Sequence, residues 1–281
     1  MASLCLQLRW EFHKLFARPR TWLGFAAFLV FELLLIALMH HGAVREEMRR
    51  SIVRLGFTFP ENFTGPTIAE FVMGNTMTIL GNLYVAMTTG EIVAREIGDG
   101  TMRMLLCRPI DRRWVLALKL LTSIVFTGIV TSFITVTALA FGLIYKGPGY
   151  WLIFSAKEQL VAHFEFWPGM ARYFIATAFM TLSVCAITTL AFLLSCLRAK
   201  PATAAIGSLC FFIVDDTLRN LPFLAAIKPH FVMTHVVGWL HIYDRRIPWD
   251  FMLRNSAWLL ALEGAFVAAG WITFMRRDLK P

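Results

Sequence analysis

The chain has 281 residues, of which 58% are hydrophobic and only 16% are charged, and its net charge is +9. Soluble domains average about 45–50% apolar and about 25% charged residues, so this composition excludes an ordinary soluble domain and indicates a membrane protein. The positive charge does not imply nucleic-acid binding, because basic cytoplasmic loops give a membrane protein the same balance. The five cysteines show no paired spacing, which argues against a disulfide framework or a zinc site.

Apolar runs predict six membrane spans in a single domain covering residues 1–281, and therefore an all-α polytopic fold. The predicted spans are 21–39, 71–93, 114–145, 173–197, 202–216 and 256–275. The second run is weaker than the others because it contains Asn75 and Asn82. The third is too long for an upright span, so we expect it to tilt or to project into the cytoplasm.

The first 19 residues predict an amphipathic helix. Apolar side chains, among them Leu8, Phe12 and Leu15, recur at helical spacing before Pro19, which breaks the helix. Such a helix can lie on the inner membrane surface or can be a plain cytoplasmic extension. With both termini placed inside, basic residues are about twice as dense on the cytoplasmic side, which favours that orientation.

The region 217–254 is the most ambiguous part of the chain. The fifth apolar run meets two aspartates after about 13 residues, or about 20 Å of helix, which is short for a span. The apolar stretch that follows is interrupted by a Lys-Pro-His sequence at 228–230, which lipid would not tolerate. The region is therefore either a re-entrant element on the outer side or a seventh span. The two arginines at 276 and 277 favour the re-entrant element, because they place the C-terminus inside.

A dense run of charge follows the second predicted span. Glu91 and Arg95 are four residues apart, a spacing that pairs opposite charges on a helix. Gly98 and Gly100 follow, and each costs about 1 kcal/mol in a helix interior. The sequence therefore predicts a charged, solvated end of the second span and a break in the helix near Gly98.

A second short helix is expected to start at Thr101 and to end at Pro109. Met102, Leu105 and Leu106 would form its apolar edge. An apolar edge with basic shoulders suits docking in a groove of another protein. The same pattern would also fit a helix that folds back onto its own spans, and the residues alone do not separate these alternatives.

The order of residues in this segment resembles the cytoplasmic loop between the second and third helices of type-2 ABC transporter (ABC-2) permeases. The matching positions are Glu96, Gly100, Thr101, Leu105, Leu106, Pro109, Arg112 and Lys119. The amphipathic N-terminus, the number of spans and the C-terminal ending are also similar. The resemblance thus extends over essentially the whole chain, although only the loop is specific.

The resemblance implies a permease subunit, expected to be an exporter, in the inner (cytoplasmic) membrane of a bacterium. Residues 1–19 would be its elbow helix, 94–113 its coupling loop and 217–254 its outer re-entrant region. The matching residues, with Met102, would couple the spans to a cytoplasmic ABC ATPase subunit. The other implied partners are a second permease, identical or paralogous, together with membrane lipids and periplasmic accessory proteins, but no nucleic acid. Both termini would be cytoplasmic, and the substrate is not implied.

The chain carries no recognisable catalytic motif of its own. No lysine follows a glycine, as the phosphate-binding loop of an ATPase requires, and no HExxH zinc motif is present. We therefore expect this chain not to be an enzyme and to bind no cofactor. ATP and Mg²⁺ would be bound by the partner ATPase.

Two carboxylates, Glu32 and Glu263, fall about midway along the first and sixth predicted spans. Acids inside a membrane usually face the protein interior, where they contact a substrate or a proton, or fix the packing of helices. The alternative function is accordingly a stand-alone secondary transporter or a membrane-embedded enzyme that uses these two acids. Threonines and serines on the third and fourth spans are expected to join helices by hydrogen bonds rather than to line a path.

Overall fold

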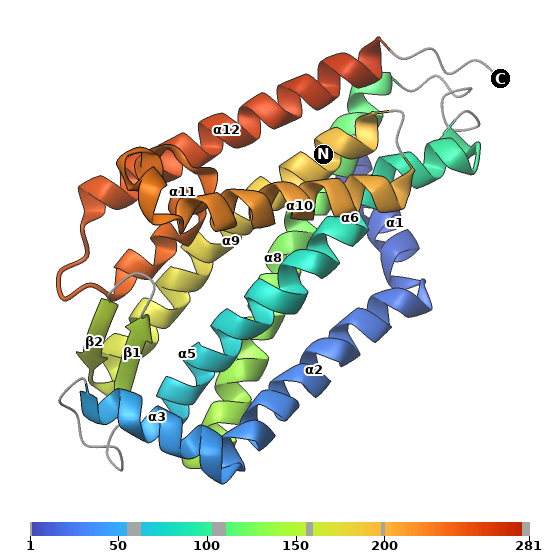
Figure 1. The fold of residues 1–281 in the computed structure, drawn as a ribbon. Coiled ribbons are helices and arrows are strands. Elements are labelled where there is room, and N and C mark those ends of the chain that lie inside the picture. Colours follow the sequence, from blue (N-terminus) through green and yellow to red (C-terminus); the bar gives the residue numbers. More distant parts are fainter. Residues whose placement is uncertain (1, 55–62, 103–110, 156–159, 198–199, 277–281) are drawn as a thin grey trace.

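The computed structural model describes residues 2–54, 63–102, 111–155, 160–197 and 200–276. Long helices lie side by side in a bundle, with a β-hairpin and short helices at one end (Figure 1). Both termini lie at the other end. The elements in chain order are α1 (Ala2–Phe16), α2 (Pro19–His40), α3 (Gly42–Arg54), α5 (Gly65–Thr76), the π-helical turn η1 (Met77–Gly81), α6 (Asn82–Gly98), α8 (Arg112–Lys146), β1 (Trp151–Ser155), β2 (Leu160–Phe164), α9 (Phe166–Cys196), α10 (Pro201–Arg219), the 3₁₀ helix η2 (Pro222–His230), α11 (Val232–Val236), the 3₁₀ helix η3 (Val237–Tyr243) and α12 (Trp249–Met275).

Five of the described helices, α2, α8, α9, α10 and α12, are long and apolar enough to cross a membrane. They correspond to five of the six predicted spans. The predicted span 71–93 lies within a continuous helical run made of α5, η1 and α6. This run is not among the five, because a π-helical turn divides it into two shorter α-helices.

The bundle is helical, as predicted, but the fold is not purely α-helical. Strands β1 and β2, between α8 and α9, pair antiparallel with Trp151 opposite Phe164. The hairpin is held to the bundle by two hydrogen bonds: the Trp151 side chain donates to the carbonyl oxygen of Phe166 at 3.0 Å, and the amide of Leu152 donates to the Thr67 hydroxyl at 2.9 Å. The β-branched and aromatic residues of this connection are the signal that the all-α prediction missed.

The N-terminal prediction is confirmed as far as the helix itself is concerned. α1 ends at Phe16, and Pro19 occupies the first turn of α2, where its missing amide hydrogen costs nothing. The corner between the two helices is closed by the hydroxyl of Thr21, which donates to the carbonyl oxygen of Leu15 at 2.6 Å. The angle between α1 and α2 is therefore fixed by side-chain bonds as well as by proline.

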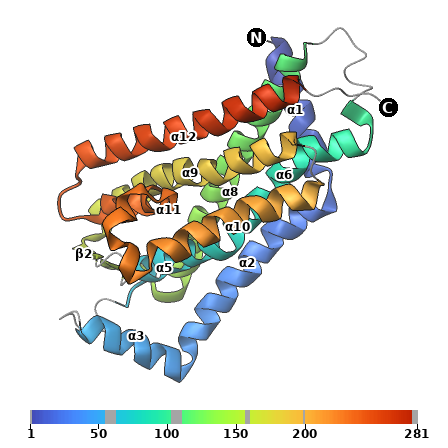
Figure 2. The ribbon, with the colours of Figure 1, turned by 45° about the horizontal axis from the view of Figure 1, so that its top comes forward.

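The region 217–254 forms short helical elements at the end of the bundle away from the termini (Figures 1 and 2). α10 arrives at this end and α12 leaves from it, so the intervening chain does not run the length of the bundle. It is attached at several points, including the Asp215 carboxylate, which accepts from the amide of Met233 at 2.6 Å, and His235, which bonds the Asn255 side chain at 2.7 Å. This arrangement disagrees with a seventh span.

α8 and α9 are joined by a ladder of threonine pairs, which confirms the predicted role of these side chains. The hydroxyl pairs are Thr127 with Thr188 at 2.8 Å, Thr131 with Thr181 at 2.7 Å and Thr135 with Thr177 at 3.3 Å. The residue numbers of the paired threonines increase along α8 and decrease along α9. The ladder therefore fixes both the antiparallel direction and the register of the two helices. Each such bond in a membrane protein contributes on average about 0.6 kcal/mol.

α5 and α8 approach closely through two glycines, Gly65 and Gly142. A methyl group on Gly65 would lie 2.6 Å from the carbonyl oxygen of Gly142, and one on Gly142 would collide with the carbonyl oxygen of Gly65. Backbone atoms cannot rotate away as side chains can, so this crossing has room for glycine alone.

We expect Gly142→Ala to lower the free energy of unfolding by about 1–3 kcal/mol, the usual cost of overpacking. The matched control is Gly128→Ala on the same helix, where the nearest atom to the added methyl is 4.0 Å away. The control should be neutral or stabilising by up to about 1 kcal/mol, because alanine favours a helix. Denaturant titration of the detergent-solubilised protein measures both, and equal stability of the two variants would contradict the close crossing.

Candidate coupling site

The helix break predicted after the second span is confirmed. α6 ends at Gly98, and Gly100 has a φ of 73°, in the left-handed region that favours glycine. Thr101 and Met102 are helical again. Leu105, Leu106 and Pro109, which belong to the predicted docking edge, lie outside the described residues.

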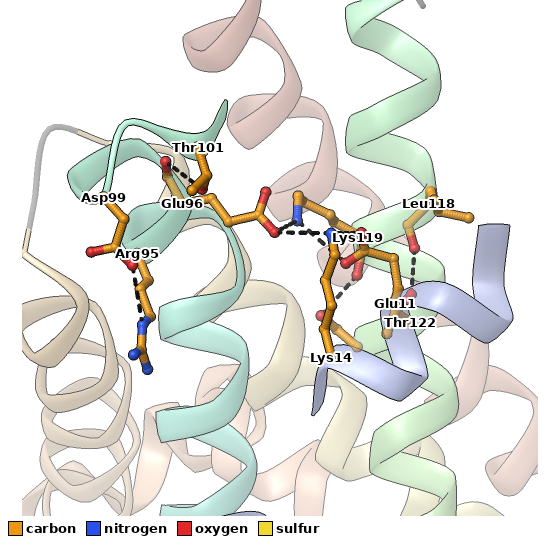
Figure 3. Close-up of polar contacts among 10 residues, drawn as sticks. Glu11, Lys14, Arg95, Glu96, Asp99, Thr101, Leu118, Lys119 and Thr122 are labelled. Atoms are coloured by element: carbon orange, nitrogen blue, oxygen red, sulfur yellow. Dashed lines mark hydrogen bonds and ion pairs between the residues drawn. The ribbon is translucent and has the colours of Figure 1, made fainter. Parts of the chain in front are cut away.

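The base of this segment is organised around the buried ammonium group of Lys119 on α8 (Figure 3). Its side chain is 1% exposed, and its Nζ lies 2.8 Å from Glu96 Oε1 on α6 and 3.4 Å from Glu11 Oε2 on α1. Lys14, more exposed, lies 2.7 Å from Glu11 and 3.6 Å from Glu96. Two lysines and two glutamates therefore tie three helices together.

The charges of this network stabilise one another. Burial alone raises the pKa of Glu11, but Lys119 and Lys14 outweigh it, so that the pKa lies below its usual value of 4.5. Burial alone lowers the pKa of Lys14, but Glu11 and Glu96 outweigh it and raise that pKa above its usual value. The stabilisation from Glu11 is thus complete above pH 4.5 and is lost as the pH falls through the lowered pKa.

A second set of ion pairs joins α6 to the start of α2. Arg20 forms an ion pair with Glu91, and Arg95 lies 3.6 Å from the same carboxylate. The predicted pairing of Glu91 with Arg95 is therefore confirmed. Arg95 also contacts Asp99, at 3.4 Å, one turn further along the helix. The end of α6 is held by charges on two sides, from α1 and α8 through Glu96 and from α2 through Glu91.

The residues named from the resemblance fall into an inner and an outer group. Glu96 and Lys119 are inside, and Met102 is fully buried in an apolar cluster with residues of α8, α9 and α12. Met102 therefore belongs to the core of this end of the bundle and is not part of an exposed docking edge. Thr101 and Arg112 are exposed, the first donating from its hydroxyl to the Glu96 carbonyl oxygen at 3.2 Å.

The two carboxylates in the spans do not form a common site. Glu32 is fully buried on α2 and accepts a hydrogen bond from the Thr137 hydroxyl at 3.0 Å, while its second oxygen has no partner among the described residues. Glu263 is buried on α12. Figures 1 and 2 show α2 and α12 on opposite sides of the bundle. A function that needs both acids together is not supported by this arrangement.

Sequence reasoning missed Glu11, because it considered the apolar positions of the first helix and not this acidic residue between them. The available signal was an acidic residue between apolar positions of that helix, next to Phe12 and one turn before Leu15. Only packing against α8 brings it to Lys119, which is 108 positions later in the chain.

The long apolar helices define a multi-pass membrane protein. The sequence pattern of the family described as "ABC-2 family transporter protein" matches residues 8–221, and the chain belongs to this family. The match covers α1, the charged segment, the threonine ladder and α10.

Among curated proteins, the chain is similar to "Uncharacterized protein YhcI" of Bacillus subtilis (strain 168), with 26% identity over 195 residues. The alignment covers 65% of this chain and 58% of the relative. No solved structure matches the chain.

The ion network generates a prediction about Lys119. Replacing it by methionine should remove the buried one of the two lysines that Glu11 and Glu96 share, and it should lower the free energy of unfolding by about 3–5 kcal/mol, the usual effect of breaking a buried pair. Lys14→Met is the matched control, because this half-exposed lysine contacts the same two glutamates. It should cost about 1 kcal/mol or less. Thermal unfolding in detergent distinguishes the variants, and equal midpoints would contradict a central role of Lys119.

Proposed function

We propose that the chain is the transmembrane permease subunit of an ABC exporter and that it is driven by ATP hydrolysed on a separate cytoplasmic ATPase. The observation that carries the proposal is the helix break at Gly98–Gly100, in a chain of the ABC-2 family. This break follows directly after Glu96, the residue of α6 that pairs with Lys119. A segment whose two flanking helices share a rigid, charge-paired base suits the transmission of movement between two proteins. ATP and Mg²⁺ are bound by the ATPase in this proposal.

The mechanism follows from the way the base is tied. A push on the segment between Gly100 and Arg112 acts first on the ends of α6 and α8. Because Lys119 binds Glu96 and Glu11 together, these ends and α1 move as one unit. A rigid connection of this kind turns ATPase closure into tilting of whole helices rather than into local bending. The elbow role of α1 and the coupling role of residues 94–113 are parts of the same proposal.

The proposed location is the inner membrane of a bacterium, with both termini in the cytoplasm. The start of α1, the end of α6, the start of α8 and the end of α12 share one end of the bundle, which supports a common side (Figures 1 and 2). The first 20 residues of the chain also contain four basic residues: Arg9, Lys14, Arg18 and Arg20. This agrees with the preference of basic residues for the cytoplasmic side. The region 217–254 is then the outer, re-entrant part. The permease is proposed to act as a dimer, with an identical or paralogous copy.

The proposed function makes a prediction about docking. Leu105→Asp with Leu106→Asp should reduce the co-purification of the ATPase to below about one tenth, because buried charge is strongly unfavourable in an apolar contact. Membrane insertion should remain normal. The control Val44→Asp carries the same change at an exposed site on α3, at the far end of the bundle, and should retain the ATPase. Undiminished complex formation by the double variant would remove the docking role of this segment.

The second prediction concerns topology. On a cysteine-free background, Asp99→Cys should react with a membrane-impermeant maleimide only after the cells are permeabilised. Glu47→Cys on α3 and Phe223→Cys on η2 should react in intact cells. All three positions are exposed in the structure, so a failure to react reflects the membrane rather than burial. Reaction of position 99 from outside would reverse the proposed orientation.

A further inference from the structure

A cavity of about 490 Å³ lies among α5, α6, α9 and the short elements α11 and η3. One part of its lining is polar, with Glu70, Asn75 and Asn82, and another is formed by soft or aromatic side chains, including Met180, Met233 and Trp239. None of these residues belongs to the network around Lys119. The cavity and the network around Lys119 are therefore separate sites.

The polar groups of the cavity are incompletely bonded within the protein. The buried Oδ1 of Asn82 has no hydrogen-bond partner among the described residues. The Glu70 carboxylate likewise has neither a hydrogen bond nor an ion pair in the described part of the chain. The side-chain nitrogen of Asn75 donates one hydrogen bond to the carbonyl oxygen of Phe71, at 2.8 Å, which leaves the Asn75 side-chain oxygen as an acceptor. Buried polar groups are nearly always bonded, so the unpaired oxygen of Asn82, beside the half-buried oxygens of Glu70 and Asn75, gives this cavity room for a donor or a cation.

The helix that carries these acceptors is also irregular at this place. The π-helical turn η1 lies between Asn75 and Asn82, and its residues Met77 and Thr78 line the same cavity. π-helical turns are rare, and they occur frequently at functional sites. This is a second observation, independent of the bonding, that points to the cavity.

We propose that the cavity binds an amphiphilic organic cation, with Glu70 as its counter-ion. This inference rests on the proposed function, since the cation would be the exported substrate. A carboxylate and the face of a tryptophan both attract a positive charge, and methionine side chains adapt to apolar groups of varied shape. Within the described residues no cluster of three or more metal-ligating side chains occurs, and the apolar part of the lining does not suit a hydrated metal ion.

The test measures binding to the full-length permease in lipid nanodiscs, with tetraphenylphosphonium as the cation and tetraphenylborate as an anion of the same shape. The wild type should bind the cation at least tenfold more tightly than the anion. Glu70→Gln keeps the size of the side chain but removes its charge, and it should weaken cation binding by about tenfold or more, because an unscreened charge pair is strong at low dielectric. Binding of the anion should be unchanged or improved.

Two further variants complete the design. Trp239→Leu should weaken binding of the cation more than that of the anion, which provides a readout if Glu70→Gln does not fold. Glu47→Gln, on the exposed surface of α3, changes charge equally and should leave binding as in the wild type. Undetectable cation binding by the wild type, equal affinity for both ions, or full affinity in well-folded Glu70→Gln would overturn the proposal.

The outcome can be separated from that of the coupling proposal. Co-purification with the ATPase is measured on the same preparations and does not depend on Glu70. A permease that holds its ATPase but shows no charge-selective binding refutes the cation site alone. One that binds the cation but never associates with an ATPase refutes the proposed function and leaves the site intact.

Discussion

The bond between Lys119 and two glutamates is the constraint on which the cytoplasmic end of this bundle depends in the proposed orientation. An ammonium group that is 1% exposed is unfavourable unless its charge is compensated, so the position of Lys119 requires Glu96 and Glu11 beside it. Those two residues come from α6 and α1, and Lys14 of α1 contacts the same two carboxylates from a more exposed position. The buried cation and its more exposed neighbour together hold the three helices at this end.

The rest of the bundle is aligned by weaker but more numerous contacts. Threonine pairs set the register of α8 against α9, and the contact of Gly65 with Gly142 sets the distance of α5 from α8. Such contacts suit a membrane protein, because lipid provides no hydrophobic force that would press helices together. α8 takes part in all three constraints: the ion network, the ladder and the glycine contact. It is the element through which a movement at one end can reach the other.

The two regions of functional interest differ in how far their charged and polar groups are paired within the protein. The network around Lys119 pairs its charges within the protein, although one oxygen of Glu96 has no hydrogen-bond partner among the described residues. Paired charges of this kind suit a rigid part that transmits force. The cavity beside Glu70 leaves acceptors open, which suits a part that must exchange partners. In the proposals made above, the first connects the permease to its source of energy and the second to its cargo. α9, which carries one side of the threonine ladder, also lines the cavity through Met180 and Ser183.

The sequence by itself determined the features that depend on local pattern. Apolar runs gave five of the candidate spans, Pro19 and Gly100 marked a helix start and a helix break, and the order from Glu96 to Lys119 indicated the family. Other features were decided only by the tertiary structure. Glu11 became part of the site because α1 packs against α8, Met102 changed from an expected docking residue to a core residue, and Glu70 gained importance from a cavity that several elements form. The hairpin β1–β2 was also missed, although the β-branched and aromatic residues of its strands gave a local signal. The physical reason is that periodicity shows which face of a helix is apolar. Burial, charge compensation and cavities depend instead on which other helix packs against that face.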